Sequence, residues 1–430
     1  MKRNIGSTSS VDSRTRHVGN NMALDPRTFF AGPWNEAIER NGARARLDAQ
    51  FLELPPIAIS VGDDVWTLRS GVDAVEVVAG CDIETLRVAI DAAAFSELMQ
   101  EQRTALGLVI GGRVVAEPMA NAVFCAWDPV LRSLLDGRHL YRPGDIAVRG
   151  ANGAPLQLNQ QFRLGDAGED AAQFLSEAGF VVLQDVFTDA EMDAVDADFS
   201  RVVADARPDD GASWWATTSA GERYPCRILD FAQRSPALRD LLADSRFLAI
   251  GEILNDKHEP GDPFGEHFSD VTAEALVKRV DSVEGLVCLP WHKDCDRGGH
   301  SMYCSGLTVG ICLTPVDEAH GGLDIMAGSH RANIARTQVD RGLDLPVVSL
   351  RANRGDVSVH MSCALHRSTH PTSDERRVAY TGFALPRREG SPDASAAHAQ
   401  PQLRQERAAI GDPSRGAQLI VDSHTERPRR

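Results

Sequence analysis

Apolar and polar residues alternate in one segment after another between Leu276 and residue 385. In "GLTVGICLTPV", Leu307, Val309 and Ile311 alternate with smaller or polar residues, and "LVKRV", "PVVSL", "DVSVHMSCALH" and "RVAYTGFAL" continue the pattern. A period of two is typical of strands that bury one face, and glycine-rich turns separate these segments. The pattern predicts an antiparallel sandwich or jelly roll in this part of the chain.

Helical signals precede the predicted strands. Thr188 and Glu191 have the spacing of a capping box ahead of apolar residues at helical intervals, and Gly179 is placed to end an earlier helix. Further upstream, "PIAISVGDDVWTLRSG" and "AVEVVAG" are typical of strands around a Gly-Asp-Asp turn, and "DAAAFSELMQEQRTALGLVIGGRVV" of a helix followed by a strand. We therefore expect a small α+β domain before the mainly β domain.

The composition changes near residues 150–170, where "RGANGAPLQLNQQFRLGDAGED" is rich in Gly, Asn and Asp. We place the domain boundary there, with an α+β domain at 25–160 and the β domain at 161–388. Polar segments without apolar periodicity at 1–24 and 389–430 are expected to be disordered tails.

The charge and the hydropathy pattern exclude several classes of partner. The 430 residues carry a formal charge of −16, so a nucleic-acid backbone is not an expected ligand. No apolar run approaches the length of a membrane span, and the N-terminal residues lack the core of a secretion signal. The eight cysteines form no CxxC pair, which favours buried thiols over a disulfide framework. A cytoplasmic location is the expectation.

One short segment, "LPWHKDCDRGGH", places His292 and Asp294 two residues apart. On an extended backbone, residues i and i+2 point to the same face, so an imidazole and a carboxylate could both reach one bound atom. This spacing makes the pair a candidate metal site.

A second histidine ligand is expected from the segment "GDVSVHMSCALHRS". Read as one strand, it places His360 and His366 on the same face. Six residues of strand would separate the two by about 20 Å, so only one of them is expected at the site. Two imidazoles and one carboxylate on a β scaffold form the facial triad of non-haem iron(II) oxygenases, whereas zinc more often takes a third histidine or a thiolate.

Residues 170–386 resemble the phytanoyl-CoA dioxygenase family of iron(II)/2-oxoglutarate oxygenases. The resemblance runs from "FLSEAGFVVLQDVFTDAEM" through "LPWHKD" and "HGGLDIMAGSHR" to "GDVSVHMSCALHRS". It implies that His292, Asp294 and His366 bind iron(II). It further implies that Arg377, with Ser368 as a second donor, binds the far carboxylate of 2-oxoglutarate, a role that suits a guanidinium fork. Arg376 is then expected to project to the opposite face.

The same resemblance implies the fold and the reaction. The fold would be a double-stranded β-helix, a cupin-like jelly roll, with flanking α-helices. The reaction would use iron(II), 2-oxoglutarate and O2 to hydroxylate a small organic substrate with release of succinate and CO2. The α+β domain resembles the sterol-carrier-like fold, in which a helix precedes a glycine-rich turn and a strand. That likeness implies a lipophilic or acyl-type substrate.

Two alternatives remain open at this point. The chain could be a lipid carrier whose oxygenase domain has lost activity, or a zinc-dependent hydrolase that uses the same triad. Formation of succinate from 2-oxoglutarate distinguishes the oxygenase from both.

Overall fold

A computed structural model describes residues 22–165, 168–208, 210–255, 258–261, 273–285, 288–295, 302 and 306–385. The expected tail at 389–430, and all but the last residues of the tail at 1–24, lie outside these ranges. Two hydrophobic clusters form the main cores, one built from residues between 29 and 140 together with Ala335, and one from residues between 162 and 383. The boundary predicted near residue 160 lies close to the start of the second cluster, against which Val148, Leu156 and Leu158 also pack.

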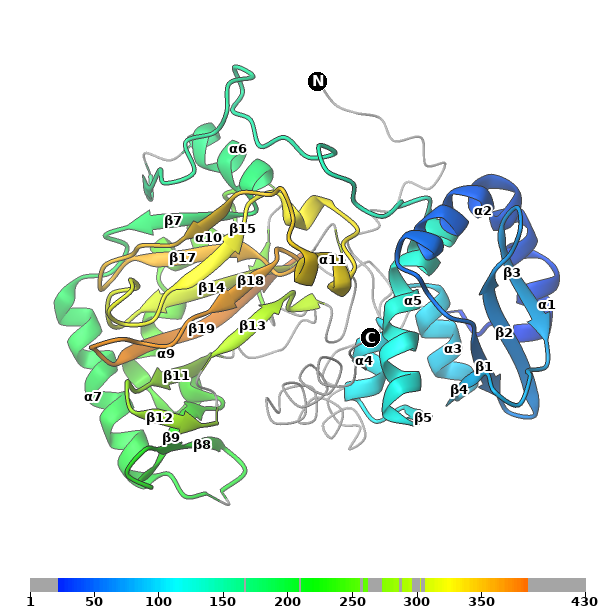
Figure 1. Cartoon of the computed structure of the whole chain (residues 1–430). Coiled ribbons are helices and arrows are strands. Elements are labelled where there is room, and N and C mark those ends of the chain that lie inside the picture. The colour runs from blue at the N-terminus through cyan, green and yellow to red at the C-terminus, as the bar shows by residue number, and fades with distance from the viewer. Residues whose placement is uncertain are drawn as a thin grey trace.

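The N-terminal unit is a five-stranded sheet covered by helices (Figure 1). Its strand order is β3-β2-β1-β4-β5, with β1 and β4 parallel and the other neighbours antiparallel. Gly62, at φ +60°, turns the chain between β1 and β2 where the Gly-Asp-Asp turn was expected. The elements are α1 (Pro26–Ala31), α2 (Pro33–Phe51), β1 (Ile57–Val61), β2 (Asp64–Ser70), β3 (Val75–Ala79), β4 (Leu86–Ile90), α3 (Ala92–Met99), α4 (Ala105–Ile110), β5 (Val114–Ala116) and α5 (Pro118–Asp136).

Helices dominate the first part of the C-terminal unit and strands dominate the second. Thr188 and Glu191 form the expected capping box at the start of α7, and Gly179, at φ +85°, follows the last residue of α6. The elements up to the first large gap are β6 (Phe162–Arg163), α6 (Gly168–Ala178), β7 (Phe180–Gln184), α7 (Asp189–Asp205), β8 (Ser213–Thr218), β9 (Arg223–Ile228), α8 (Phe231–Arg234), α9 (Pro236–Leu242), α10 (Ser245–Ile250) and β10 (Glu259–Pro260).

The remaining elements build two sheets. They are β11 (Glu274–Lys278), β12 (Ser282–Glu284), β13 (Leu289–His292), β14 (Gly306–Cys312), β15 (Leu323–Met326), a 3-10 turn η3 (Ser329–Arg331), α11 (Arg336–Arg341), β16 (Val347–Ser349), β17 (Val357–Met361), β18 (His366–Ser368) and β19 (Arg376–Ala384). The larger sheet has the order β12-β8-β9-β11-β19-β14-β17-β7-β6, with β10 paired to β19. The smaller sheet has the order β13-β18-β15-β16. This unit is rich in sheet, as expected.

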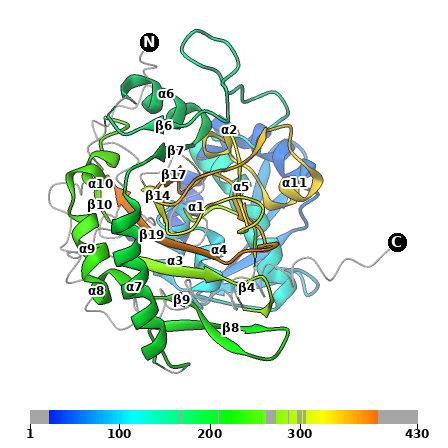
Figure 2. The same cartoon turned by 90° about the vertical axis from the view of Figure 1, so that its left-hand side faces the viewer.

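Helices cover the outer face of the larger sheet. Figure 2 looks from that side and shows α7, α8, α9 and α10 in front of the strands. Phe383 of β19 stacks on Phe247 of α10, with ring centroids 4.9 Å apart. The other face of β19 carries Arg376 and Tyr380, because side chains alternate along a strand. Strand β19 is therefore largely buried on both faces.

The inner face of the larger sheet meets the smaller sheet. The ammonium group of Lys278 on β11 donates to the hydroxyl of Ser368 on β18, at 2.6 Å, and so joins the two sheets. In the larger sheet, Thr308 lies opposite His360 and Gly310 lies opposite Tyr380, so these positions share the inner face. The candidate site residues are drawn from this space between the sheets.

The segment from 356 to 366 is not the single strand that its alternation predicted. Strand β17 ends at Met361 in the larger sheet, and β18 begins at His366 in the smaller one. Between them the amide of Ala364 donates to the carbonyl oxygen of Met361, which closes a turn. The chain therefore changes sheet within the segment that carries both histidines.

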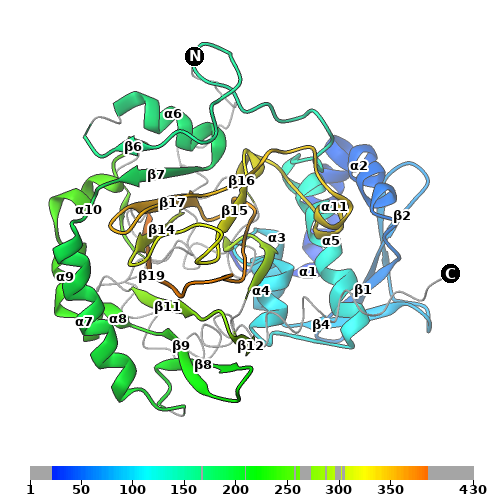
Figure 3. The ribbon, with the colours of Figure 1, turned by 60° about the vertical axis from the view of Figure 1, so that its left-hand side comes forward.

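The two units contact each other through residues 333–344, which include α11. Figure 3 shows α11 beside α5, and Asn333 donates from its amide to the carbonyl oxygens of Pro129 at 2.8 Å and Arg138 at 2.7 Å. The buried amide of Gln338 donates to the carbonyl oxygen of Tyr141. The phenol of Tyr141 in turn donates to the carboxylate of Asp344. Buried polar groups that are paired in this way specify one arrangement of the two units.

Among the described residues, none of the helices combines the length and the apolar character needed to cross a bilayer.

Candidate metal centre

Three of the expected ligands come together at the edge of the smaller sheet. His292 ends β13, Asp294 follows it, and His366 begins β18, where it is paired with His292 across the two strands. The Oδ1 atom of Asp294 lies 3.6 Å from Nε2 of His292 and 3.6 Å from Nε2 of His366. One donor atom from each residue lies within 4.8 Å of the others, as required of ligands that share one ion.

Backbone contacts hold these three side chains in place. The Nδ1 atoms of His292 and His366 lie 2.7 Å and 3.0 Å from the carbonyl oxygens of Pro290 and Ala364, and each donates its hydrogen there. With Nδ1 directed at the backbone, the Nε2 atom of each ring faces Asp294. The amide of Asp294 donates to the carbonyl oxygen of Ser362 at 2.8 Å, which ties the two ligand segments together.

Burial and the neighbouring groups favour the protonation states that bind a metal. Burial, together with the neighbouring His292, lowers the pKa of His366 well below its usual value, so its ring is neutral. Burial alone would raise the pKa of Asp294, but the imidazoles of His366, His292 and His360 hold it well below its usual range. A neutral imidazole and an ionised carboxylate are the forms in which these groups act as ligands.

The donor set fits iron(II). Two imidazole nitrogens and one carboxylate oxygen on a β scaffold are the ligand types of a facial triad, which leaves positions for a co-substrate and oxygen. All three side chains are largely buried, with His292 and His366 only 7% and 5% exposed. No thiolate belongs to the cluster that the described residues form.

His360 lies much closer to the site than expected. Its ring centroid is 4.5 Å from that of His366, and its Nε2 lies 3.5 Å from Oδ2 of Asp294. The prediction that about 20 Å would separate the two histidines was wrong, because it assumed one continuous strand. The turn after Met361 brings the two side chains back together.

The family model that describes phytanoyl-CoA dioxygenase (PhyH) matches residues 175–379, a range that contains the whole triad. Residues 175–379 form a PhyH domain. The resemblance expected for residues 170–386 is thereby confirmed. The match ends before the last residues of β19 and does not include the N-terminal unit.

Several solved structures are similar to about half of the chain. AviO1 from Streptomyces viridochromogenes Tue57 is 19% identical and has a TM-score of 0.42, over 52% of this chain and 96% of AviO1. The epimerase SnoN from nogalamycin biosynthesis is 19% identical and has a TM-score of 0.40, over 52% and 84% of the two chains. EctD from S. alaskensis with 2-oxoglutarate and 5-hydroxyectoine is 17% identical and has a TM-score of 0.41, over 58% and 86%. No curated protein matches the chain.

In the PhyH domain, Arg376 and Arg377 of β19 lie on the faces of the strand opposite to those expected. Arg377 points outward, where its guanidinium binds the carboxylates of Glu375 at 2.6 Å and Asp196 at 3.5 Å. Arg376 points inward and is 1% exposed. The assignment of the inner face to Arg377 was therefore wrong, because alternation along β19 gives Arg376 the face of Tyr380.

The inward guanidinium is held by a carbonyl oxygen and a hydroxyl, and no described carboxylate pairs with it. Arg376 donates from Nη1 to the carbonyl oxygen of Gly321 at 3.0 Å and from Nη2 to the hydroxyl of Tyr380 at 2.9 Å. Its Nε has no partner within the described part of the chain. On the neighbouring strand, Lys278 lies opposite Arg376 and is 1% exposed. Two buried cations thus lie side by side, and neither forms an ion pair with any described carboxylate.

The hydroxyl of Ser368, predicted as a second donor to the co-substrate, accepts two hydrogen bonds in this structure. Ser368 is two residues after His366 on β18, and its hydroxyl accepts from Nζ of Lys278 at 2.6 Å and from the amide of Leu289 at 3.2 Å. Lys278 itself was not expected in the site. The segment "LVKRV" did contain a feature that pointed to Lys278, because Leu276 and Lys278 share one face of a strand. A charged residue on an otherwise apolar face needs a partner.

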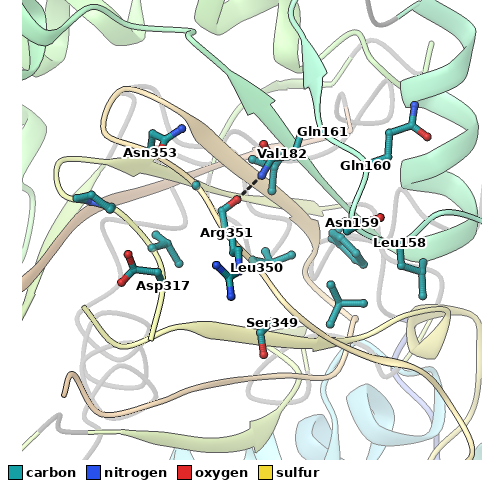
Figure 4. Close-up of a pocket in the computed structure, with 15 residues that line it drawn as sticks. Leu158, Asn159, Gln160, Gln161, Val182, Asp317, Ser349, Leu350, Arg351 and Asn353 are labelled. Carbon is teal, nitrogen blue, oxygen red and sulfur yellow. Dashed lines mark hydrogen bonds between the residues drawn. The ribbon is translucent and has the colours of Figure 1, made fainter. Parts of the chain in front are cut away.

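A cavity of about 470 Å³ lies at the edge of the PhyH domain, between the 158–161 segment, β7 and the end of β16 (Figure 4). Gln161 donates across it to the carbonyl oxygen of Arg351, and Asp317 lies on its wall. None of its lining residues belongs to the triad or to the pair of buried cations. The cavity is therefore distinct from the metal centre.

Proposed function

We propose that this chain is an iron(II)- and 2-oxoglutarate-dependent oxygenase that hydroxylates a small organic substrate. The observation that carries the proposal is the pairing of two features between the same two sheets. One is a buried His/Asp/His triad, and the other is a pair of buried cations for which the described residues offer no acidic partner. The first suits a metal with open positions, and the second suits a carboxylate.

The proposed fold of the oxygenase domain is the double-stranded β-helix. Its support is the arrangement of the two sheets face to face, antiparallel except where β6 joins β7, with the candidate ligands on the inner side. Helices α7 and α10 pack on the outer side, as expected for flanking helices.

Each residue of the candidate site has a separate role in the proposed reaction. His292, Asp294 and His366 would hold the metal. Arg376 would bind the far carboxylate of 2-oxoglutarate through Nε and the adjoining Nη, and Lys278 would contribute a second cation to the same carboxylate. Ser368 would keep the ammonium of Lys278 in position. When bound, the iron with its co-substrate and oxygen supplies the oxidising power, while the protein orients the reactants and excludes water.

The experiment that tests this proposal joins metal analysis to turnover. Purified protein loaded anaerobically with iron(II) should convert 2-oxoglutarate to succinate and CO2 once oxygen is admitted. A zinc hydrolase with the same triad, or a carrier with an inactive oxygenase domain, would form no succinate. Iron binding without any succinate over a range of candidate substrates would refute the proposal.

The substrate is proposed to be lipophilic or acyl-type, on the basis of the N-terminal unit. Helices α3 and α4 there precede a Gly111-Gly112 turn, with Gly112 at φ +73°, and the strand β5. This is the order on which the sterol-carrier likeness depends. Titration of the full chain with a fluorescent fatty acyl probe tests the idea, and a complete lack of binding would remove the support for a lipophilic substrate.

The affinity for 2-oxoglutarate should depend on pH through Lys278. Burial, helped by the nearby Arg376, lowers the pKa of Lys278 to about 7. A bound carboxylate favours the ammonium form and so raises that pKa. Affinity should therefore be greatest below about pH 7 and fall by up to about tenfold per pH unit above it. Calorimetric titration between pH 6 and pH 9 measures the effect.

The Lys278→Met variant is the control for that experiment. It keeps the buried volume similar but has no group that titrates, so its affinity should be lower at pH 6 and nearly flat across the range. If the variant retained the full slope, another group would be responsible and Lys278 would have no part in binding the carboxylate.

A further inference from the structure

His360 is a buried imidazole whose hydrogen bonds are unaccounted for. The side chain is on β17, opposite Thr308 of β14, and the residue is 1% exposed. Neither ring nitrogen has a hydrogen-bond partner among the described residues. Leaving a buried polar group unpaired typically costs about 1–3 kcal/mol, so such a group in a folded core calls for a specific reason.

The nearest part of the metal centre is the outer oxygen of Asp294. Nε2 of His360 lies 3.5 Å from Oδ2 of that carboxylate, slightly longer than an ordinary N–H···O bond of 2.7–3.2 Å. The hydroxyl of Thr308 already donates to the same Oδ2 at 2.9 Å. The other oxygen, Oδ1, is the one that faces His292 and His366. One carboxylate oxygen therefore faces the other two candidate metal ligands, and the second faces the hydrogen-bond donors.

His360 does not belong to the ligand cluster itself. The group whose donor atoms lie within 4.8 Å of one another contains His292, Asp294 and His366, and His360 is not among them. Its ring lies beside that of His366 at 4.5 Å between centroids, with the planes inclined at 54°. A role for His360 at the metal would thus act through Asp294.

We propose that His360 is a positioning residue that donates from Nε2 to Oδ2 of Asp294 and, with Thr308, restricts Asp294 to binding the metal through Oδ1 alone. The inference rests on the proposed function. With both donors satisfied, Oδ2 is unavailable to the metal. Three coordination positions then remain after the triad, two for 2-oxoglutarate and one for oxygen. If Asp294 bound through both oxygens, the last of these positions would be lost.

The donated hydrogen bond is expected to shorten when the metal is bound. Hydrogen bonds at catalytic centres are often long without their ligands and tighten in the assembled complex. A metal on Oδ1 fixes the rotation of the carboxylate, and partners of this kind outside the ligand set commonly change metal affinity by about 10- to 100-fold.

The test uses the full chain loaded with Mn(II), which needs no turnover. Electron paramagnetic resonance in 17O-enriched water reports whether a water molecule remains on Mn(II) after 2-oxoglutarate is added. The wild type should keep a water in the last position. His360→Leu should lose it and should bind Mn(II) about 10-fold or more weakly. His360→Gln, whose amide can donate to the same Oδ2, should restore most of the water signal.

Thr308→Val provides a second variant that removes the other donor to Oδ2 at nearly constant shape. It should shift the water signal in the same direction as His360→Leu, and it keeps the proposal testable if His360→Leu fails to fold. Thermal unfolding of the metal-free variants separates folding defects from metal effects.

Three results would overturn the proposal. A His360→Leu protein that keeps the water and the metal affinity but melts earlier would make His360 a packing residue. A folded His360→Leu protein that binds no Mn(II) at all would make it a ligand. A Thr308→Val protein with an unchanged water signal would mean that Oδ2 needs no donor. In contrast, failure of the wild type to bind Mn(II) or 2-oxoglutarate would count against the proposed function itself.

Discussion

Alanine at His292, Asp294 or His366 is expected to abolish iron(II) binding. Each substitution removes one of three donor atoms that lie within 4.8 Å of one another, and the remaining pair cannot complete a facial triad. The affinity for iron(II) should fall by more than about 100-fold. Removal of a residue that only contacts a metal ligand lowers metal affinity by up to about that factor. Anaerobic dialysis against iron(II) followed by metal analysis measures the affinity, and formation of succinate should disappear in the same variants.

His320→Ala is the matched control for these three variants. His320 is a partly buried histidine of the same domain, but its ring contacts Asp317, 2.7 Å away, and it is not in the ligand cluster. It should keep its iron. Equal metal loss in the control would show that the assay reports unfolding, and iron retained by Asp294→Ala would remove that carboxylate from the ligand set.

Arg376→Met is expected to weaken 2-oxoglutarate binding by about 2–5 kcal/mol, the usual cost of breaking a buried hydrogen-bonded charge pair. The residue is 1% exposed, and Nε has no partner in the described part of the chain, so a carboxylate would find an unused donor there. Calorimetric titration of the Mn(II)-loaded protein with 2-oxoglutarate gives the affinity without turnover.

Arg377→Met separates the two neighbouring positions. Arg377 binds Glu375 and Asp196 on the helix-covered side of β19 and lies over the ring of Phe199. Its loss should leave the co-substrate affinity unchanged and reduce stability by about 1 kcal/mol or less, because the ion pairs are partly exposed. The reverse ranking of the two variants would restore the role that the family resemblance implied for Arg377.

The sequence could predict the strands and most of the metal centre because both depend on short-range patterns. The spacing of His292 and Asp294 places an imidazole and a carboxylate together on any extended backbone. The period-two alternation at β14, β17 and β19 is equally local. The family resemblance then supplied the third ligand, His366, and the match to residues 175–379 contains it.

The inner face of β19 could not be predicted in the same way. Alternation separates Arg376 from Arg377, but it does not say which face turns inward when both faces are buried. The strand carries apolar residues on both sides, since helices cover one side and the smaller sheet covers the other. Only the pairing register, in which Arg376 lies opposite Lys278, decides between the two arginines.

His360 was misplaced for a different reason. The alternation in "DVSVHMSCALH" continues through the turn after Met361, so the sequence shows no break where the chain leaves one sheet for the other. The break depends on tertiary contacts, such as the hydrogen bond from the amide of Leu365 to the hydroxyl of Ser329. Contacts between residues that are distant in sequence leave no periodic signal.

The contact between the two units also determines when each part of the protein can complete its folding. Asn333 meets the carbonyl oxygen of Pro129 across 204 residues of chain, and that of Arg138 across 195. Synthesis at 5–20 residues per second delivers about 200 residues in roughly 10–40 s. Throughout that interval Tyr141 lacks the other buried members of its hydrophobic cluster, which lie between residues 326 and 365. The proposed iron ligand His366 emerges later still, so the proposed metal centre can form only after the chain has had this period in which to bind a chaperone or to aggregate.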